Sequence, residues 1–253
     1  MDSKIIQVKG LVKKYGDLTA VNGISFDVYK GEIFGLLGPN GAGKTTTLEI
    51  METLRDKTSG EVFIDGLSVD KDQNLIKKII GVQLQAAGYY PNLYLNELLE
   101  LFAGLYNVDI DPAEILKLVD LNEKTGSKFK ELSGGQKQRF SICTTIINNP
   151  KVIFLDEPTT GLDPQARRNL WELIRTIREK GTTVMLTTHY MDEAEILCDR
   201  VGIIDHGKIL TIDTPDNLID KLLHEGFERK KQIRSASLED VFLNLTGHEL
   251  RDE

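Results

Sequence analysis

The segment GPNGAGKTT, which runs from Gly38 to Thr46, limits the folds open to this chain more than any other. It matches the pattern G-x-x-x-x-G-K-[ST] in full and lies between an expected buried strand, Glu32–Leu37, and an expected helix, Lys44–Leu54. Glycines allow the backbone N–H groups to curl around a phosphate, and the N-terminus of the helix adds a favourable dipole. The predicted phosphate ligands are Gly38, Pro39, Asn40, Gly41, Ala42, Gly43, Lys44, Thr45 and Thr46.

Two side chains of this loop have more specific predicted roles. Lys44 can reach the β and γ phosphates of a nucleotide, and the Thr45 hydroxyl can bind Mg²⁺. The alternative interpretation is a glycine turn followed by an exposed lysine. The full match and its strand–helix context favour the phosphate loop.

Strand and helix patterns alternate around a helical segment in the middle of the chain. Further strands are expected at Ile5–Val12, Ile24–Val28, Glu61–Ile64, Lys78–Leu84, Val152–Leu155, Thr183–Thr187, Val201–Ile204 and Lys208–Ile212. Further helices are expected at Leu95–Tyr106, Pro112–Leu118, Pro164–Lys180, Asp192–Leu197 and Ser237–Leu245.

This pattern predicts the α/β fold class, with a P-loop NTPase core and a mainly parallel sheet. We also expect an N-terminal antiparallel β subdomain and an inserted α-helical subdomain. The predicted ATPase domain spans residues 1–225, with its core at 1–85 and 150–225 and the helical subdomain at about 86–149. Residues 226–253 are expected to be a short C-terminal tail with one helix.

Composition excludes several functional classes. The net charge of -8 argues against a protein that wraps nucleic acid by its phosphates, so no nucleic-acid partner is expected. Only two cysteines occur, Cys143 and Cys198, far apart, which argues against a disulfide framework and fits a reducing cytoplasm. We expect neither a signal peptide nor a membrane span. If the protein works at a membrane, another polypeptide must provide the spanning part.

Acidic residues follow a second buried strand. Asp156 and Glu157 end the apolar run of VIFLDE, where burying two acids is costly unless a cation or a reaction requires them. In a parallel sheet they lie at the same edge as the phosphate loop. Asp156 is predicted to hold Mg²⁺ through a water, and Glu157 to polarise the attacking water. The alternative is an acid pair that caps a helix, which the following Pro158 weakens.

Two more strands end in candidate side chains. His189 follows the strand Thr183–Thr187 and could hydrogen-bond the γ-phosphate or the attacking water, although a lone histidine is often structural. Gln85 ends the strand Lys78–Leu84, where its amide can contact Mg²⁺ or water. Gln83 competes for this role, because strand alternation turns both side chains to the same side.

A second candidate anion site lies in ELSGGQKQRFS, Glu131 to Ser141. Ser133 and Gln136 have the S-x-x-Q spacing of a capping box, so helix initiation alone explains them. Exposed N–H groups and the Ser133 hydroxyl could instead accept a phosphate from outside. Lys137 and Arg139 make the start of this helix cationic, against the preference of the helix dipole, which favours an anionic partner.

Taken together, these motifs resemble the ATP-binding subunit of ABC transporters over nearly the whole chain. Gly38–Thr46 resembles the Walker A motif, Val152–Glu157 resembles Walker B with its catalytic glutamate, and LSGGQ matches the family signature. The resemblance further implies roles for Gln85 (Q-loop), Asp163 (D-loop), His189 (switch histidine) and Tyr15, which would stack on adenine. A lone tyrosine after a strand is more often a packing or surface residue.

The resemblance implies how the two anion sites work together. Two chains would enclose two ATP molecules head to tail, with the signature of one chain, Ser133, Gly134, Gly135 and Gln136, closing on the nucleotide of the other. The implied cofactors are ATP and Mg²⁺, the latter bound by Thr45, Gln85 and Asp156. The implied partners are an integral-membrane permease and a second ATPase subunit, identical or related.

Longer segments, including TTHYMDEAEILCDRVGIIDHGKI and SLEDVFLNLTG, resemble the ABC-2 type export branch. Thr160, where a serine is common, and Cys143, at a usually small apolar position, are minor departures. The implied function is the motor of an exporter, peripheral on the inner face of the cell membrane. The rival predictions are an ABC ATPase that acts on ribosomes or DNA and a nucleotide switch that does not hydrolyse ATP.

Overall fold

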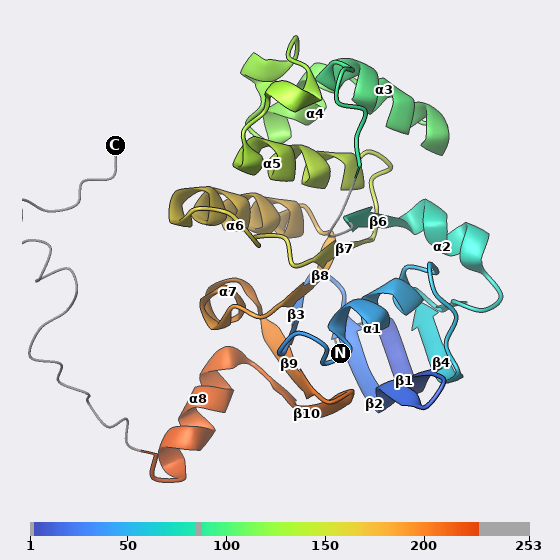
Figure 1. Cartoon of the computed structure of the whole chain (residues 1–253), viewed down its shortest axis with the longest axis vertical. Helices are drawn as coiled ribbons and strands as arrows, with labels where there is room; N and C mark the ends of the chain where they lie inside the picture. Colours follow the sequence, from blue (N-terminus) through green and yellow to red (C-terminus); the bar gives the residue numbers. More distant parts are fainter. Residues whose placement is uncertain (1–2, 84–87, 228–253) are drawn as a thin grey trace, which may run out of the picture. The chain divides into compact units, whose positions relative to one another are not determined.

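Two sheets organise the residues up to Asn217, which form one unit in the computed structural model (Figure 1). The structure describes residues 3–83 and 88–227. The larger sheet has the order β10 (Lys208–Asp213), β9 (Arg200–Asp205), β3 (Ile33–Leu37), β8 (Thr183–Thr188), β7 (Val152–Asp156), β6 (Ile80–Gln83). Neighbouring strands within this sheet are parallel, except that the edge strand β10 is antiparallel to β9. Every residue of β3, β7 and β8 is buried, as expected for strands covered on both faces.

The smaller sheet is antiparallel and has the order β2 (Leu18–Tyr29), β1 (Lys4–Tyr15), β4 (Ser59–Ile64), β5 (Leu67–Ser68). Asp65 and Gly66 form the turn between β4 and β5 with φ values of 48° and 80°, the left-handed pair that a tight hairpin requires. The rings of Phe26 on β2 and Phe34 on β3 stack with centroids 5.5 Å apart. One hydrophobic core therefore joins the two sheets.

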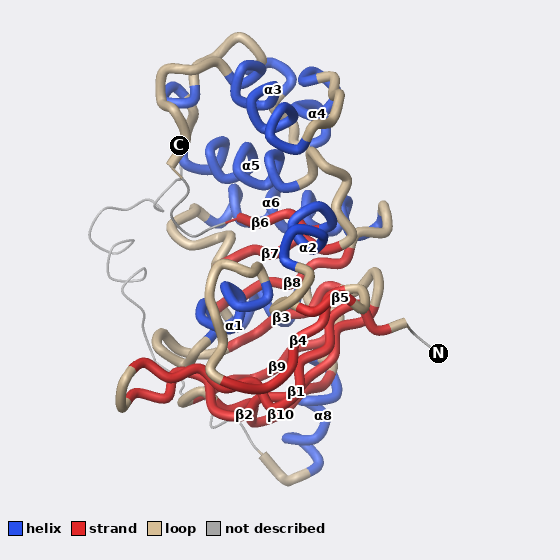
Figure 2. The backbone as a smooth tube through the Cα atoms, turned by 90° about the vertical axis from the view of Figure 1, so that its right-hand side faces the viewer, coloured by secondary structure: helices blue, strands red, loops and turns tan. Residues whose placement is uncertain are grey.

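The helices are α1 (Lys44–Met51), α2 (Gln73–Ile79), α3 (Leu95–Tyr106), α4 (Pro112–Leu118), α5 (Gly134–Thr145), α6 (Pro164–Glu179), α7 (Met191–Leu197) and α8 (Pro215–His224). Short 3₁₀ turns lie at Asn122–Lys124 and Phe129–Glu131. Helices α3, α4 and α5 lie together beyond the β6 edge of the larger sheet (Figures 1 and 2). Of the described residues, those from Leu218 to Phe227 belong to a second unit. The helix predicted at Ser237–Leu245 lies outside the described residues.

The predicted fold class is confirmed, but several elements differ from the sequence-based prediction, and β1 and β2 are longer than expected. The strand expected from Lys78 begins only at Ile80, because the preceding residues form α2. Ile76 is buried from the helix and Ile80 from the strand, so one apolar run serves two elements. Helix α8 was not predicted, although the Thr214 hydroxyl accepts from Asn217 N just before Pro215, which is a recognisable helix start.

Gly81 on β6 offers a test of how closely α5 packs on the larger sheet. A Cβ at this position would lie 2.0 Å from the backbone oxygen of Thr145, which cannot move aside as a side chain can. Gly81→Ala is therefore expected to lower the free energy of unfolding by about 1–3 kcal/mol or more in urea titrations. Gly104→Ala, in α3 with nothing within 4 Å of the added methyl group, is the control and should not destabilise. Equal stability of the two variants would contradict the close packing of α5 on β6.

Candidate nucleotide site

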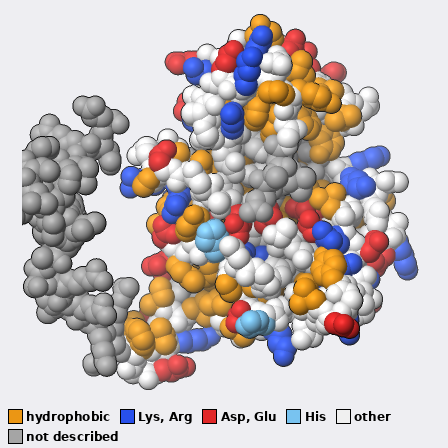
Figure 3. Space-filling view, viewed as in Figure 1, with side chains coloured by type: hydrophobic (Ala, Val, Ile, Leu, Met, Phe, Trp, Pro, Cys, Tyr) orange, Lys and Arg blue, Asp and Glu red, His pale blue; other side chains and the backbone are white. Residues whose placement is uncertain are grey.

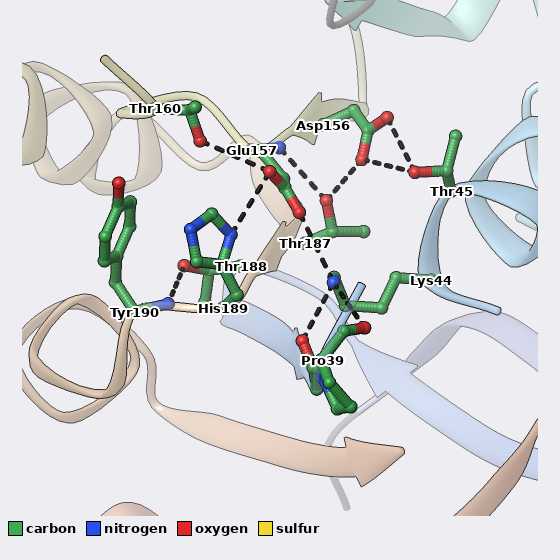
Figure 4. A network of polar contacts seen from close by, with 11 residues as sticks. Pro39, Lys44, Thr45, Asp156, Glu157, Thr160, Thr187, Thr188, His189 and Tyr190 are labelled. Atoms are coloured by element: carbon green, nitrogen blue, oxygen red, sulfur yellow. Dashed lines mark hydrogen bonds and ion pairs between the residues drawn. The ribbon is translucent and has the colours of Figure 1, made fainter. Parts of the chain in front are cut away.

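The candidate site is built at the carboxyl edge of the larger sheet. The phosphate loop connects β3 to α1, Asp156 ends β7, and His189 follows β8. Because β3, β8 and β7 are parallel neighbours, their carboxyl ends bring these residues together (Figure 4). The Q-loop prediction is not decided here, since Gln85 lies outside the described residues. Gln83 is buried at the end of β6, and its Oε1 atom has no hydrogen-bond partner among the described residues.

The phosphate loop needs its glycines for two different reasons. A Cβ at Gly38 would lie 2.2 Å from the backbone oxygen of Ile204, so the loop passes too close to β9 for a side chain. Gly43 has a φ of 100°, and a Cβ there would meet the Ala20 oxygen at 2.4 Å. The loop backbone is thus fixed against two neighbouring strands before the helix begins.

Lys44, the first residue of α1, is almost fully buried, with 4 % of its surface exposed. Its Nζ atom donates to the backbone oxygens of Gly38 (2.8 Å) and Pro39 (3.1 Å) and lies 3.3 Å from Glu157 Oε1. The ammonium group is therefore held at the centre of the site by one carboxylate and two carbonyl groups (Figure 4).

Asp156 and Thr45 form the candidate metal site. The Thr45 hydroxyl lies 3.2 and 3.0 Å from the two oxygens of Asp156, and the Thr187 hydroxyl donates to Asp156 Oδ1. Burial raises the pKa of Asp156, while the hydrogen bonds from Thr187 and Thr45 oppose that rise. A hydroxyl and a carboxylate are the hard oxygen ligands that Mg²⁺ prefers, so this pair fits the ion.

No group of three or more His, Cys, Asp or Glu side chains among the described residues could hold a metal by itself. A magnesium ion at Thr45 and Asp156 would therefore depend on oxygens from water and from the nucleotide, as is usual for Mg²⁺ at phosphates.

Glu157 occupies a strained backbone position, with a φ of 47°. Its N–H group points to Thr187, 3.0 Å from the hydroxyl and 3.2 Å from the carbonyl oxygen, which fixes this conformation. The carboxylate contacts Lys44 at one oxygen, and its other oxygen accepts from the Thr160 hydroxyl at 3.3 Å. Burial alone would raise the pKa of Glu157, but the nearby His189 and Lys44 outweigh it and hold the pKa below its usual value. Glu157 is thus ionised, as a residue that polarises water requires.

His189 stands beside this carboxylate, with Nδ1 3.2 Å from Glu157 Oε2 (Figure 4). The Nδ1 atom is buried but not aligned for a hydrogen bond with any described group. The structure therefore brings five predicted residues together: Lys44, Thr45, Asp156, Glu157 and His189. Two residues that the sequence did not single out join them, Thr187 and Thr160. Thr187 could have been suspected, because it lies on β8 two residues before His189, which follows the strand.

The phosphate loop, Glu157 and His189 line one cavity of about 630 Å³, together with Tyr15, Leu18, Ala20 and Thr160. The Tyr15 ring is partly exposed at this cavity, and Lys13 Nζ and Arg55 Cζ lie 5.1 and 5.4 Å from its centroid. A partly exposed aromatic ring with cations beside it suits a planar base that carries phosphates.

The signature residues lie at a different cavity, of about 390 Å³. Its lining includes all four predicted residues, Ser133 to Gln136, with Arg139 and the D-loop residue Asp163. Ser133 and Gln136 form the predicted capping box, with bonds of 2.9 and 3.3 Å, and Asp163 caps α6 by accepting from Ala166 N at 2.8 Å. No residue lines both cavities. Among the described residues, the two candidate anion sites of one chain therefore lie in separate cavities.

Glu52, which the sequence did not single out, is a buried acid near this site. Only 2 % of it is exposed, and its Oε1 atom has no hydrogen-bond partner among the described residues. Burial raises its pKa from 4.5 to about 8, and the negative charges of Asp156 and Glu49 add to the rise. The carboxyl is therefore protonated in the folded protein at neutral pH.

A pH dependence of stability follows from Glu52. The folded state binds this proton more tightly than the unfolded state, so the contribution of Glu52 to stability is fully present below pH 4.5 and is lost as the pH rises to about 8. The Glu52 contribution is at most about 5 kcal/mol. Glu52→Gln, which is neutral at every pH, should lose less stability than the parent between about pH 5 and about pH 9 in urea titrations. Parallel pH profiles of the two proteins would contradict the protonated state.

Comparison with known proteins now identifies the family. Residues 21–160 match the family model described as ABC transporter. The linearmycin resistance ATP-binding protein of Bacillus subtilis (strain 168) is 38 % identical over 244 residues, which cover 94 % of this chain and 78 % of that protein. The chain belongs to the ABC transporter family. It is an ATP-binding subunit with ATPase activity, as the sequence predicted.

Other members agree with this assignment. The Nod factor export ATP-binding protein I of Burkholderia orbicola (strain AU 1054) is 34 % identical, with 98 % of each chain covered. A dimeric ATP-binding cassette, solved in a post-hydrolysis state with ADP and Pi, is 28 % identical with a TM-score of 0.74 and covers 83 % of this chain and 98 % of its own. The rival prediction of an ABC ATPase that acts on ribosomes or DNA gains no support from these relatives.

The comparisons do not decide every prediction. The ABC-2 branch rests on the sequence resemblance, and the roles of individual site residues stay predictions. In residues 3–83 and 88–227, no helix is long and apolar enough to cross a membrane.

Proposed function

We propose that this chain is the motor subunit of an ABC-2 type exporter, bound to a separate membrane permease on the inner face of the cell membrane. The names of the relatives in resistance and export support this class of transporter. The transported substrate would be recognised by the permease. Two ATPase subunits, identical or related, would close over two ATP molecules and reopen after hydrolysis.

The observation that carries the proposal is the separation of the two cavities. One holds the phosphate loop, Glu157 and His189, and the other holds the LSGGQ residues and Asp163, with no shared lining residue. The helix N-terminus at Ser133 is a candidate anion site, and no described residue that lines the nucleotide cavity also lines the cavity beside it. Head-to-tail pairing of two chains gives each nucleotide both sites.

Within each composite site the residues have distinct proposed roles. Lys44 would bind the β and γ phosphates in place of its present loop carbonyls, and Glu157 would then be free to polarise water. His189 would hold the γ-phosphate or that water. Ser133 and Gly135 of the second chain would donate to the same phosphate.

Mg²⁺ would be held by the Thr45 hydroxyl and by Asp156, with Gln85 as a further ligand. When bound, the ion would neutralise part of the negative charge on the phosphates. Asp156 is kept in place for this role by Thr187, which also fixes Glu157, so one hydroxyl orients both acids.

The helical segment at about 86–149 would contact the permease, and Gln85 would transmit closure to it. Exposed hydrophobic side chains of α3 support this, because Leu101 and Leu105 have 42 % and 74 % of their surface exposed. Hydrophobic side chains also gather over the helical segment in the space-filling view (Figure 3). Patches of this kind on soluble subunits mark contacts with other proteins.

The dependence of turnover on protein concentration tests the proposed assembly. If each ATP requires two chains, phosphate release per chain rises with chain concentration until the dimer saturates, in parallel with ATP-dependent mass by light scattering. A constant rate per chain from a monomer at every concentration would overturn the proposal. No phosphate release at any concentration would favour the rival nucleotide switch.

Tyr15 is expected to set nucleotide affinity rather than the rate of hydrolysis. Tyr15→Ala removes the aromatic face and should weaken ATP binding about tenfold, the loss of about 1–3 kcal/mol of base stacking. Tyr15→Phe keeps the ring and should bind ATP nearly as the parent does. Calorimetric titration of both variants measures the difference, and equal affinity of Tyr15→Ala and the parent would show that Tyr15 is only a surface residue.

A further inference from the structure

Helices α6 and α7 are joined by a row of polar contacts along one face of α6. Arg167 Nη1 donates to Asp192 Oδ2 (3.3 Å), Trp171 Nε1 to the buried Glu193 Oε1 (3.0 Å), and Arg175 Nη2 to the Ile196 oxygen (2.6 Å). The α6 residues are spaced four apart, so they lie on one side of the helix. This row holds α7 against α6. The chain enters α7 through His189 and Tyr190, which directly precede Met191.

Arg167 stands at the end of the row nearest the nucleotide site. Its guanidinium carbon lies 4.3 Å from the centroid of the Tyr190 ring, and the Tyr190 ring lies 4.2 Å from that of His189, at 37°. The ion pair with Asp192 contributes little, because the Asp192 side chain is 54 % exposed. The connection from α6 to His189 therefore depends more on the stacked guanidinium, phenol and imidazole groups of Arg167, Tyr190 and His189 than on this ion pair.

The imidazole needs such support. Its Nδ1 atom lies near Glu157 but is not aligned for a hydrogen bond with any described group, so hydrogen bonding at this nitrogen does not fix the ring. Tyr190 is itself held, because its N–H group donates to the Thr188 hydroxyl at 3.0 Å (Figure 4). The packing contact that the imidazole makes with the Tyr190 ring can therefore support its direction, beside the ion-pair contact with Glu157.

The position of Arg167 also connects the two cavities. Asp163 and Ala166, in the first turn of α6, line the signature cavity, and Arg167 is the next residue. His189 lines the nucleotide cavity. Two ring contacts thus connect the first turn of α6 with His189.

We infer that Arg167 and Tyr190 are positioning residues for His189, and that they tie its imidazole to the helix that borders the signature cavity. This inference rests on the catalytic role proposed for His189. Arg167 does not reach the reacting phosphate. It acts by keeping the imidazole beside the Glu157 carboxylate while the second chain closes on α6.

The test compares four variants of the full-length chain in steady-state ATP hydrolysis. Arg167→Ala and Tyr190→Leu should lower kcat about tenfold or more, with KM for ATP changed by less than about twofold, because a misplaced catalytic group slows chemistry without weakening binding. Tyr190→Phe keeps the ring for the cation and should restore the parent rate. Arg175→Ala is the matched control, since it removes an arginine contact to α7 two turns farther along α6.

A spectroscopic readout separates positioning from general destabilisation. The imidazole signals of His189 in a carbon–proton NMR spectrum, assigned by their loss in His189→Ala, should move in Arg167→Ala and Tyr190→Leu and stay in place in Arg175→Ala. If Arg167→Ala does not fold, the Leu and Phe variants of Tyr190 decide the matter alone. Unmoved signals, or an equal loss of kcat in Arg175→Ala, would overturn the inference. If His189→Ala hydrolyses ATP normally, the role proposed for His189 fails instead.

Discussion

Glu157→Gln is expected to stop ATP turnover and to leave two chains closed over bound ATP. Glutamine keeps the size of the side chain but cannot accept a proton, and removing a general base costs about 10²–10⁴-fold in rate. The contacts that orient the backbone at this strained position, from Glu157 N to Thr187, do not involve the carboxylate and remain. Phosphate release at saturating ATP measures the loss, and light scattering measures the trapped dimer.

Glu61→Gln is the control for this experiment, because Glu61 is an exposed acid on β4, away from the carboxyl edge of the larger sheet. It removes the same charge and should hydrolyse ATP at the parent rate. A Glu157→Gln chain that stays monomeric at saturating ATP and hydrolyses it normally would show that the carboxylate beside Lys44 is only a structural ion-pair partner. The same result would contradict the proposed mechanism.

The residues that the sequence placed correctly are those whose position depends on local chain geometry. A phosphate loop is recognisable because its glycines, its lysine and its helix start lie within nine residues. Asp156 and Glu157 were placed at the same edge because parallel strands align their carboxyl ends, whatever the order of the strands. The capping box at Ser133 is local as well, and the structure has both of its hydrogen bonds.

What the sequence could not supply depends on strand order and on long-range packing. The order β3-β8-β7 puts Thr187 between the phosphate loop and Asp156, and no local pattern contains that information. The pairing of Lys44 with Glu157, which are more than one hundred residues apart, has the same origin. Burial of Glu52 depends on how α1 packs on both sheets, so its raised pKa could not be predicted from the sequence.

The second large effect is expected from Gly135→Asp in the signature. A Cβ at Gly135 lies 3.1 Å from the Ala166 methyl group, and the added carboxylate would place a negative charge where a phosphate is expected. Repulsion between the two anions should abolish both ATP-dependent dimerisation and turnover. ATP binding to the monomer should stay nearly unchanged, because the nucleotide cavity shares no residue with this one. Gly126→Asp, at an exposed position with nothing within 4 Å, is the matched control.

Mixing two inactive chains decides whether the signature acts on the partner's nucleotide. The Lys44→Ala chain lacks the lysine that binds phosphate but has an intact signature. The Gly135→Asp chain has an intact phosphate loop but a defective signature. In a head-to-tail heterodimer the intact halves meet in one of the two composite sites, so the mixture should release phosphate faster than the sum of the separate chains. No gain from a mixture shown to form the heterodimer would place the signature on its own chain's nucleotide. Loss of monomeric ATP binding in Gly135→Asp would show that the LSGGQ segment does no more than start α5.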